Sequence, residues 1–279
     1  MVLGLLAALA SAVCYGVASV LQAIAARTAV QTRGVDPRLL LRLVRRVPFL
    51  GGVLLDIGGF VAQFAALRAV PVFLVQAALA ANLAVTAVVA VPVLGTRLQR
   101  REWIAVAAVT AGLGMLAVSA GAEGHGVMRG SLRLALLGSV VLLAVAGFAA
   151  GRLPDPARSA VLGVVAGLSF GVVALAARAL TDLSPAHLIR DPASYAALCG
   201  GLAAFLFYAT GLQRGAVTIT TAAVVVGETI LPAAVGVLVL GDRTRTGLAP
   251  LAVAGFLVAV TGALALARFG QAPTPQAAT

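Results

Sequence analysis

Charged residues are scarce in this sequence. Only 10% of the 279 residues are charged, whereas 61% are hydrophobic and the mean hydropathy is +1.08. A soluble domain cannot bury that much apolar surface in one core, so these proportions exclude an ordinary soluble globular protein. Lysine is absent, since all 20 basic residues are arginine, against nine acidic residues. The arginines lie between apolar segments and form no stripe, which argues against nucleic-acid binding and indicates topology signals beside membrane spans.

Cysteine and histidine are equally rare. Cys14 and Cys199 lie in apolar segments without His or Cys at ligand spacing, which indicates neither a disulfide framework nor a zinc site. His125 and His187 fall in loops that are predicted to be external, and no carboxylate pair lies nearby, so we expect no metal site. The sequence contains no Ser/His/Asp set and no nucleotide-binding loop. We therefore expect neither an enzyme nor a cofactor.

Long apolar runs fill most of the chain. A bilayer core about 30 Å thick needs about 20 apolar residues in a helix, and nine windows of that kind are bounded by Arg, Pro, Gly or Asp. The first run continues to Ala26 without a basic leader, so we expect a span there and not a cleaved signal peptide. The tail from Gln271 to Thr279 is expected to be disordered. The nine predicted spans are Val2 to Ala26, Pro48 to Leu67, Val70 to Leu94, Trp103 to Ala120, Leu132 to Gly151, Ala160 to Leu180, Tyr195 to Leu212, Val217 to Leu240 and Leu248 to Ala267.

Arginine is distributed unevenly between the two sides that nine spans would create. Thirteen arginines fall on one side and seven on the other. Basic loops stay in the cytoplasm, so this asymmetry predicts a cell-membrane protein with an external N-terminus and a cytoplasmic C-terminus. The first loop contributes most of the difference, through Arg27, Arg33, Arg38, Arg42, Arg45 and Arg46.

The two halves of the chain resemble each other. A shift of 146 residues superposes Arg68 on Arg214, Asn82 on Glu228, and the segment starting at Leu94 (Leu-Gly-Thr-Arg) on the one at Leu240 (Leu-Gly-Asp-Arg). With a few residues of slippage, Tyr15-Gly16 matches Phe170-Gly171. We therefore predict a first repeat over residues 1–121, a linking helix and loops over 122–157, a second repeat over 158–269 and a tail over 270–279.

The first four predicted spans correspond to the last four, and the fifth span, Leu132 to Gly151, is left over. Corresponding helices are therefore five apart and cross the membrane in opposite directions. The predicted fold is an all-α transmembrane bundle of about nine helices, in which two inverted four-helix repeats are joined by a linking helix. Inverted repeats that meet at the midplane are typical of transporters, since two packings of the halves give alternating access to one site. Duplication also occurs in membrane proteins that transport nothing.

Ionisable residues inside spans are costly and are therefore candidates for function. Glu228 is predicted near the midplane, and Pro232 four residues later cannot donate to its carbonyl, so we expect a kink and a free backbone acceptor there. Asp56 is predicted in the cytoplasmic half, either as a proton relay or as a partner of a neighbouring helix or arginine. Other polar residues inside the predicted spans could line a cavity or join helices. They are Asn82, Gln63, Gln76, Gln22, Tyr15 and Tyr208.

Several segments resemble the drug/metabolite transporter superfamily, in particular its EamA-like and NIPA-type magnesium-transporter branch. The most telling stretch runs from Gly59 to Val75 and is similar to the family's second helix leading into its third. The motifs Leu94-Gly95, Arg101-Glu102-Trp103 and Ala111-Gly112-Leu113-Gly114 resemble the end of a superfamily repeat. Similar segments occur in the second half, from Tyr208 to Arg214 and from Leu240 to Arg243. The resemblance covers Met1 to Arg268 and implies a membrane transporter.

Three departures separate this chain from the magnesium branch. NIPA-type proteins carry an acidic residue at the position of Phe60 and Thr-Pro-Leu-Gly at Gln76–Leu79, and the superfamily's usual Leu-Gly-Glu is Leu-Gly-Thr at Leu94–Thr96. The resemblance therefore favours the superfamily more strongly than the magnesium branch.

Three functions remain open at this stage. The first is secondary transport of a small organic solute, driven by protons through Glu228 and Asp56. The second is transport of magnesium or another divalent cation, for which two carboxylates with retained waters would suffice. The third is a non-transporting scaffold or lipid-handling protein. All three require the lipid bilayer as a partner, and none involves nucleic acid.

Overall fold

Long apolar helices make up the structure, a computed structural model that describes residues 2–29, 34–67, 69, 75, 78–79, 81–95, 98–121, 130–155, 157–180, 184–214, 217–241 and 243–269. Seven helices in this part of the chain are long and apolar enough to cross a membrane. They are α1 (Val2–Thr28), α3 (Val47–Leu67), α6 (Arg100–Ser119), α7 (Gly130–Ala150), α8 (Ala157–Ala179), α10 (Pro192–Arg214) and α12 (Ala249–Phe269). The protein is therefore an all-helical membrane protein.

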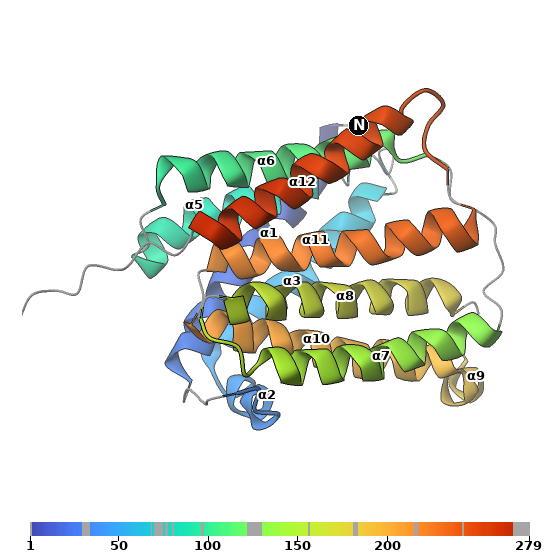
Figure 1. The fold of residues 1–279 in the computed structure, drawn as a ribbon, viewed down its shortest axis with the longest axis horizontal. Helices are drawn as coiled ribbons and strands as arrows, with labels where there is room; N and C mark the ends of the chain where they lie inside the picture. Colours follow the sequence, from blue (N-terminus) through green and yellow to red (C-terminus); the bar gives the residue numbers. More distant parts are fainter. Residues whose placement is uncertain are drawn as a thin grey trace, which may run out of the picture.

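Two further apolar helices are shorter. These are α5 (Asn82–Leu94) and α11 (Val217–Val235), and α11 continues as one π-helical segment, η1 (Gly236–Leu240). They fall within the predicted spans Val70 to Leu94 and Val217 to Leu240, although part of the first span lies outside the described residues. Two short helices that the sequence did not predict, α2 (Arg38–Leu43) and α9 (Pro185–Arg190), lie at opposite ends of the bundle (Figure 1).

Helix α6 begins at Arg100, three residues before the predicted span. The reason is a capping box, in which Gln99 and Glu102 satisfy each other's backbone amide groups. The Gln99 amide donates to the Glu102 carboxylate at 2.6 Å. This cap places Arg100 and Arg101 in the first turn of the helix.

The helices pack in three groups. Helix α1 packs along α3 and α5, α8 packs along α10 and α11, and α6 packs against α12 at one edge of the bundle (Figure 1). Glycine makes the closest approaches possible: a Cβ atom on Gly112 would lie 2.5 Å from the backbone of Ala259, and one on Gly227 would lie 2.7 Å from the Val164 carbonyl oxygen. Small residues of this kind allow membrane helices to pack tightly.

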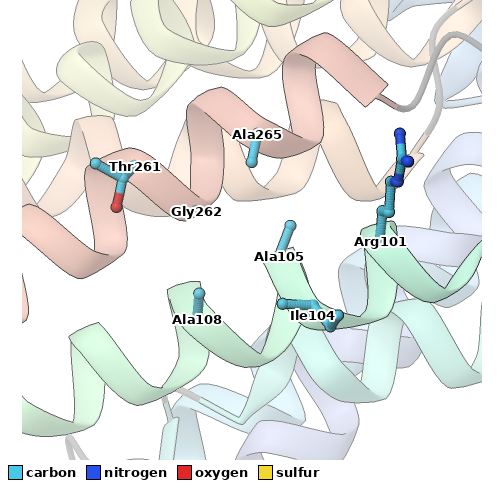
Figure 2. A pocket seen from close by; sticks show the side chains of 7 residues that line it. All are labelled: Arg101, Ile104, Ala105, Ala108, Thr261, Gly262 and Ala265. Atoms are coloured by element: carbon cyan, nitrogen blue, oxygen red, sulfur yellow. The ribbon is translucent and has the colours of Figure 1, made fainter.

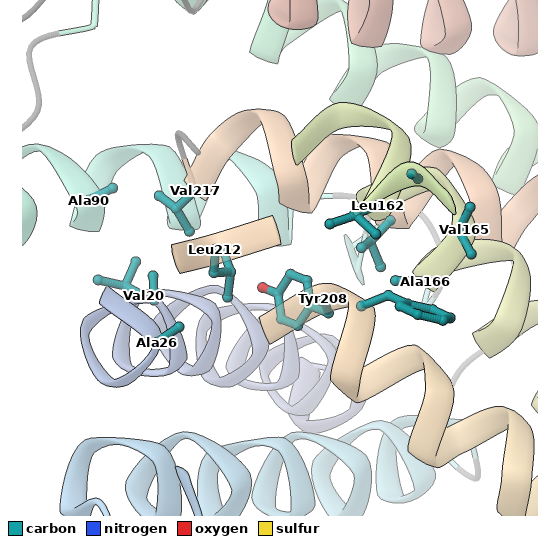
Figure 3. Close-up of a cluster of buried hydrophobic side chains, with 13 residues drawn as sticks. Val20, Ala26, Ala90, Leu162, Val165, Ala166, Tyr208, Leu212 and Val217 are labelled. Carbon is teal, nitrogen blue, oxygen red and sulfur yellow. The ribbon is translucent and has the colours of Figure 1, made fainter. Parts of the chain in front are cut away.

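The groups meet in a central cluster of buried side chains. Figure 3 shows residues of α1, α5, α8, α10 and α11 converging there, with the hydroxyl group of Tyr208 among them. Val20, Leu162 and Leu212 are each at most 1% exposed. Two halves of the chain that are distant in sequence therefore share one core around a polar group.

An ion pair joins three helices at the end of the bundle that carries α9. Arg133 of α7 contacts the carboxylate of Asp191, and its guanidinium also donates to the Ala179 carbonyl at 2.9 Å. Asp191 is only 4% exposed and accepts a hydrogen bond from the amide of Ala193 at 2.9 Å, at the start of α10. His187 Nε2 lies 3.3 Å from the same carboxylate. The pair therefore fixes the ends of α7, α8 and α10 together.

Replacing Arg133 by Ala is expected to lower the free energy of unfolding by about 3 kcal/mol, because a buried carboxylate loses its partner. Denaturant unfolding in detergent micelles measures the change. The control is Arg42→Ala, because Arg42 and Asp36 lie 3.2 Å apart with both side chains partly exposed. Such a pair contributes about 1 kcal/mol or less. Equal losses in the two variants would contradict this ranking.

Candidate functional site

Helix α1 carries a stripe of polar side chains through the apolar bundle. Ser11, Tyr15, Ser19 and Gln22 follow one another at spacings of three or four residues, which places them on one face of the helix. The Ser11 hydroxyl donates to the Gly59 carbonyl of α3 at 2.7 Å. The Tyr15 hydroxyl donates to Gln63 Oε1 at 3.0 Å, also on α3. We call these four residues of α1 the polar stripe.

Asp56 is held by the polar stripe. Gln22 Nε2 donates to Asp56 Oδ2 at 2.6 Å, and Gln22 is only 4% exposed. Gly52 allows this approach, since a Cβ atom there would lie 2.7 Å from Gln22 Cγ and 3.1 Å from the Ala18 carbonyl oxygen. Of the roles predicted for Asp56, the hydrogen bond to a neighbouring helix is present. Its role as a proton relay remains a prediction.

Tyr208 of α10 approaches the polar stripe from the other half of the chain. Its hydroxyl lies 3.3 Å from Thr221 Oγ1 of α11 and also interacts with the Ser19 side chain. The carboxyl groups of both Asp56 and Glu228 lie within electrostatic range of this hydroxyl, and of the Tyr15 hydroxyl as well. The two acids predicted from the sequence therefore lie in the neighbourhood of the same two tyrosines.

Glu228 differs from Asp56 because no described residue donates a hydrogen bond to its carboxyl group. It is partly buried near the middle of the segment formed by α11 and η1. Helix α8 comes very close here, since a Cβ atom on Gly167 would lie 2.9 Å from the Glu228 amide nitrogen. A carboxyl group at this depth without a donor is open to a proton or to a ligand.

Asn82 begins α5 beside α1. A Cβ atom on Gly16 would lie 2.9 Å from the Asn82 carbonyl oxygen, and Thr86 Oγ1 also donates to that oxygen, at 2.9 Å. The side-chain oxygen of Asn82 is buried and has no hydrogen-bond partner among the described residues. Helices α5 and α11 are in contact, which brings Asn82 and Glu228 onto packed helices. Gln76, another predicted candidate, lies outside the described residues.

The helix that carries Glu228 continues past Pro232. It is α-helical to Val235, and its winding becomes π-helical at Gly236–Leu240. Proline has no amide hydrogen to donate to the Glu228 carbonyl four residues earlier. The predicted kink and the free backbone acceptor at Pro232 stay predictions.

The candidate list from the sequence omitted several hydroxyl groups. Ser11, Ser19, Thr86 and Thr221 all contact the site, yet Ser and Thr are common in membrane helices and often bond to their own backbone. The spacing of Ser11, Tyr15 and Ser19 by four residues each was the signal that could have found two of them. Tyr208 was noted in the sequence as polar but was not ranked with the acids.

The site offers oxygen atoms and no clustered metal ligands. Among the described residues, no group of three or more His, Cys, Asp or Glu side chains could hold a metal ion. His187 contacts Asp191 at one end of the bundle, and His125 lies outside the described residues. The arrangement instead provides two carboxyl groups, two phenols and several amides from helices that pack around α1.

Comparison of the chain with protein-family models, with curated proteins and with solved structures gives no match.

The hydrogen bond between Gln22 and Asp56 is expected to contribute a coupling energy of about 1 to 2 kcal/mol, because it is short and shielded from water. The measurement is a double-mutant cycle in detergent micelles that combines Gln22→Leu with Asp56→Leu. Two side chains that interact directly make the paired effects non-additive. Additive losses would show that the bond contributes nothing to stability.

Proposed function

We propose that this chain is a secondary transporter that moves a small solute across the cell membrane. The observation that carries the proposal is the carboxyl group of Glu228, which lies in an apolar bundle without a donor among the described residues and within electrostatic range of the two tyrosines that also lie near Asp56. A purely structural carboxyl group at this depth would be expected to have a partner, because an unpaired one is costly.

In this proposal each polar group has a distinct role. Glu228 binds and releases the coupling proton, and a solute competes with the proton for its carboxyl group. Tyr15 and Tyr208 contact the solute from the two halves of the chain. Asp56, already bonded to Gln22, orients α1 and relays charge toward the arginine-rich end.

The packing supports two repeats. Gly16 of α1 approaches the backbone of Asn82 on α5, and Gly167 of α8 approaches the backbone of Glu228 on α11. Asn82 and Glu228 are the residues that the 146-residue shift superposes. In each half, a glycine of the first helix therefore approaches the helix that carries Asn82 or Glu228.

A second set of contacts is also similar in the two halves. A Cβ atom on Gly52 of α3 would meet Ala18 and Gln22, and one on Gly200 of α10 would meet Ser169 and Val173 of α8. In each half, the second long helix therefore approaches the first at the same places. We propose nine spans in which α7 links two inverted repeats, as in transporters with alternating access.

The proposed orientation places the N-terminus outside and the C-terminus in the cytoplasm. The basic helix α2 and the first turn of α6 lie at one end of the bundle, and α9 lies at the other (Figure 1). Basic residues concentrate on the cytoplasmic side of membrane proteins.

A solute panel in proteoliposomes tests the proposal. Purified protein is reconstituted, a pH gradient is imposed, and uptake of labelled amines, amino acids, sugars and magnesium is measured side by side. Uptake of at least one organic solute above protein-free liposomes is the expected result. Uptake of magnesium alone would favour a divalent-cation transporter, and no uptake by correctly folded protein would contradict the proposal.

A further inference from the structure

A groove runs along the surface between α6 and α12, away from the polar stripe. Its volume is about 330 Å³. Figure 2 shows Ala105 and Ala108 on one wall, Thr261 and Ala265 on the other, and Arg101 at one end. Both walls belong to helices that are long enough to span the bilayer, so the groove is open to lipid along its length.

The walls carry small, mostly apolar side chains, and the one hydroxyl group among them is bonded to its own helix. Gly262 brings the helices together, since a Cβ atom there would lie 2.9 Å from the backbone of Val109. The Thr261 hydroxyl donates to the Leu257 carbonyl of its own helix at 2.7 Å. The Thr261 hydroxyl is therefore already satisfied, and the groove suits a hydrocarbon chain better than a polar ligand.

The charged end of the groove lies at the basic end of the bundle. Arg101 is exposed in the first turn of α6, at the same end as the basic helix α2 (Figure 1). The described acids at this end are already engaged within the chain: Asp36 with Arg42, Asp155 with Arg158, and Glu102 in the cap of α6. None of these three acids is therefore available to pair with Arg101 of a second copy of the chain, which argues against a dimer contact at this end of the groove.

We propose that this groove is a binding site for an anionic phospholipid of the cytoplasmic leaflet, with one acyl chain between α6 and α12 and the phosphate group beside Arg101. A bound acyl chain would cover apolar groove walls that the protein leaves open. The guanidinium would pair with the phosphate, as in basic pockets between membrane helices on the cytoplasmic side. This lipid site does not depend on the transport proposal.

A tryptophan in the groove wall provides the readout. The chain's single tryptophan, Trp103, does not line the groove and lies two residues from Arg101, on another face of α6, so it is replaced by Phe and Ile104, which lines the groove, is replaced by Trp. The protein is reconstituted in phosphatidylcholine bilayers containing brominated phosphatidylglycerol, and in phosphatidylglycerol bilayers containing brominated phosphatidylcholine. Bromine quenches tryptophan fluorescence at short range, so the two series give the relative affinity for the anionic lipid. One arginine near the membrane surface predicts a preference of roughly fivefold.

Three variants decide the origin of the preference. Arg101→Ala and Ala265→Leu, which fills the groove, are expected to reduce the preference to near unity. Arg100→Ala is the matched control, since Arg100 is the adjacent arginine and does not line the groove, and it is expected to keep the preference. An unchanged preference in Arg101→Ala or Ala265→Leu, or an equal loss in Arg100→Ala, would overturn the proposal. The proposal would also be overturned if Ala265→Leu changed a dimer into a monomer and left the lipid preference intact.

Discussion

Replacing Glu228 by Gln is expected to abolish uptake driven by a pH gradient, reducing it to the level of protein-free liposomes. Glutamine keeps the size and polarity of the side chain but cannot bind and release a proton. Because no described residue donates to the Glu228 carboxyl group, the substitution breaks no hydrogen bond, and the variant should fold normally. The measurement is uptake of a transported solute with and without the imposed gradient.

The matched control is Glu102→Gln. Glu102 is also a buried glutamate, but it caps the start of α6 at the end of the bundle and lies away from the polar stripe. Glutamine keeps an acceptor oxygen for the Gln99 amide, so this variant should lose less than about 1 kcal/mol of stability and keep its response to the pH gradient. A Glu228→Gln variant that responded to the gradient as the parent does would rule out Glu228 as the coupling group.

Replacing Gly167 by Val is expected to prevent folding of the bundle. A Cβ atom at this position would lie 2.1 Å from the Val224 carbonyl oxygen and 2.9 Å from the Gly227 Cα atom, both on the backbone of α11. Backbone atoms cannot move aside as a flexible side chain can, so α8 and α11 would have to separate. Overpacking in protein cores typically costs about 1 to 3 kcal/mol, and a clash with backbone should exceed that range.

The measurement for Gly167→Val is the fraction of protein that elutes as a single monodisperse species, together with its thermal stability in detergent. Gly138→Val is the control, because nothing lies within 4 Å of a Cβ atom at Gly138 of α7. The control should behave as the parent does. A Gly167→Val variant of parental stability would mean that α8 and α11 are farther apart than described.

The sequence predicted the membrane environment and most of the helices because both depend on composition and on length alone. Seven predicted spans coincide with long helices. The first turn of α6 was not predicted, because its arginines lower the hydropathy there to a value typical of a loop. The short helices α2 and α9 were not predicted because of their length. Six residues are too few to give a periodic signal.

The candidate site was only partly predictable. Asp56 and Glu228 were found because acids are rare in apolar spans, but their common relation to Tyr15 and Tyr208 depends on how four helices pack. The partner of Asp56 followed from tertiary contact with Gln22, which is distant in sequence. Ser19 reaches Tyr208 because it lies one helical turn beyond Tyr15. Its hydroxyl group does not ionise, so its position in a span does not mark it as costly in the sequence.

Access to the polar stripe from both sides of the membrane tests the central proposal most directly. Asn82→Cys, made in a chain with Cys14→Ala and Cys199→Ala, places a single thiol beside α1 at the proposed solute site. A membrane-impermeant maleimide is applied from each side of oriented proteoliposomes, with Leu142→Cys on the lipid-facing side of α7 as the control. Alternating access predicts labelling at Asn82→Cys from either side, decreasing when solute is bound, and no labelling at Leu142→Cys. Labelling of Asn82→Cys from one side only, or from neither, would contradict a transporter built around Glu228.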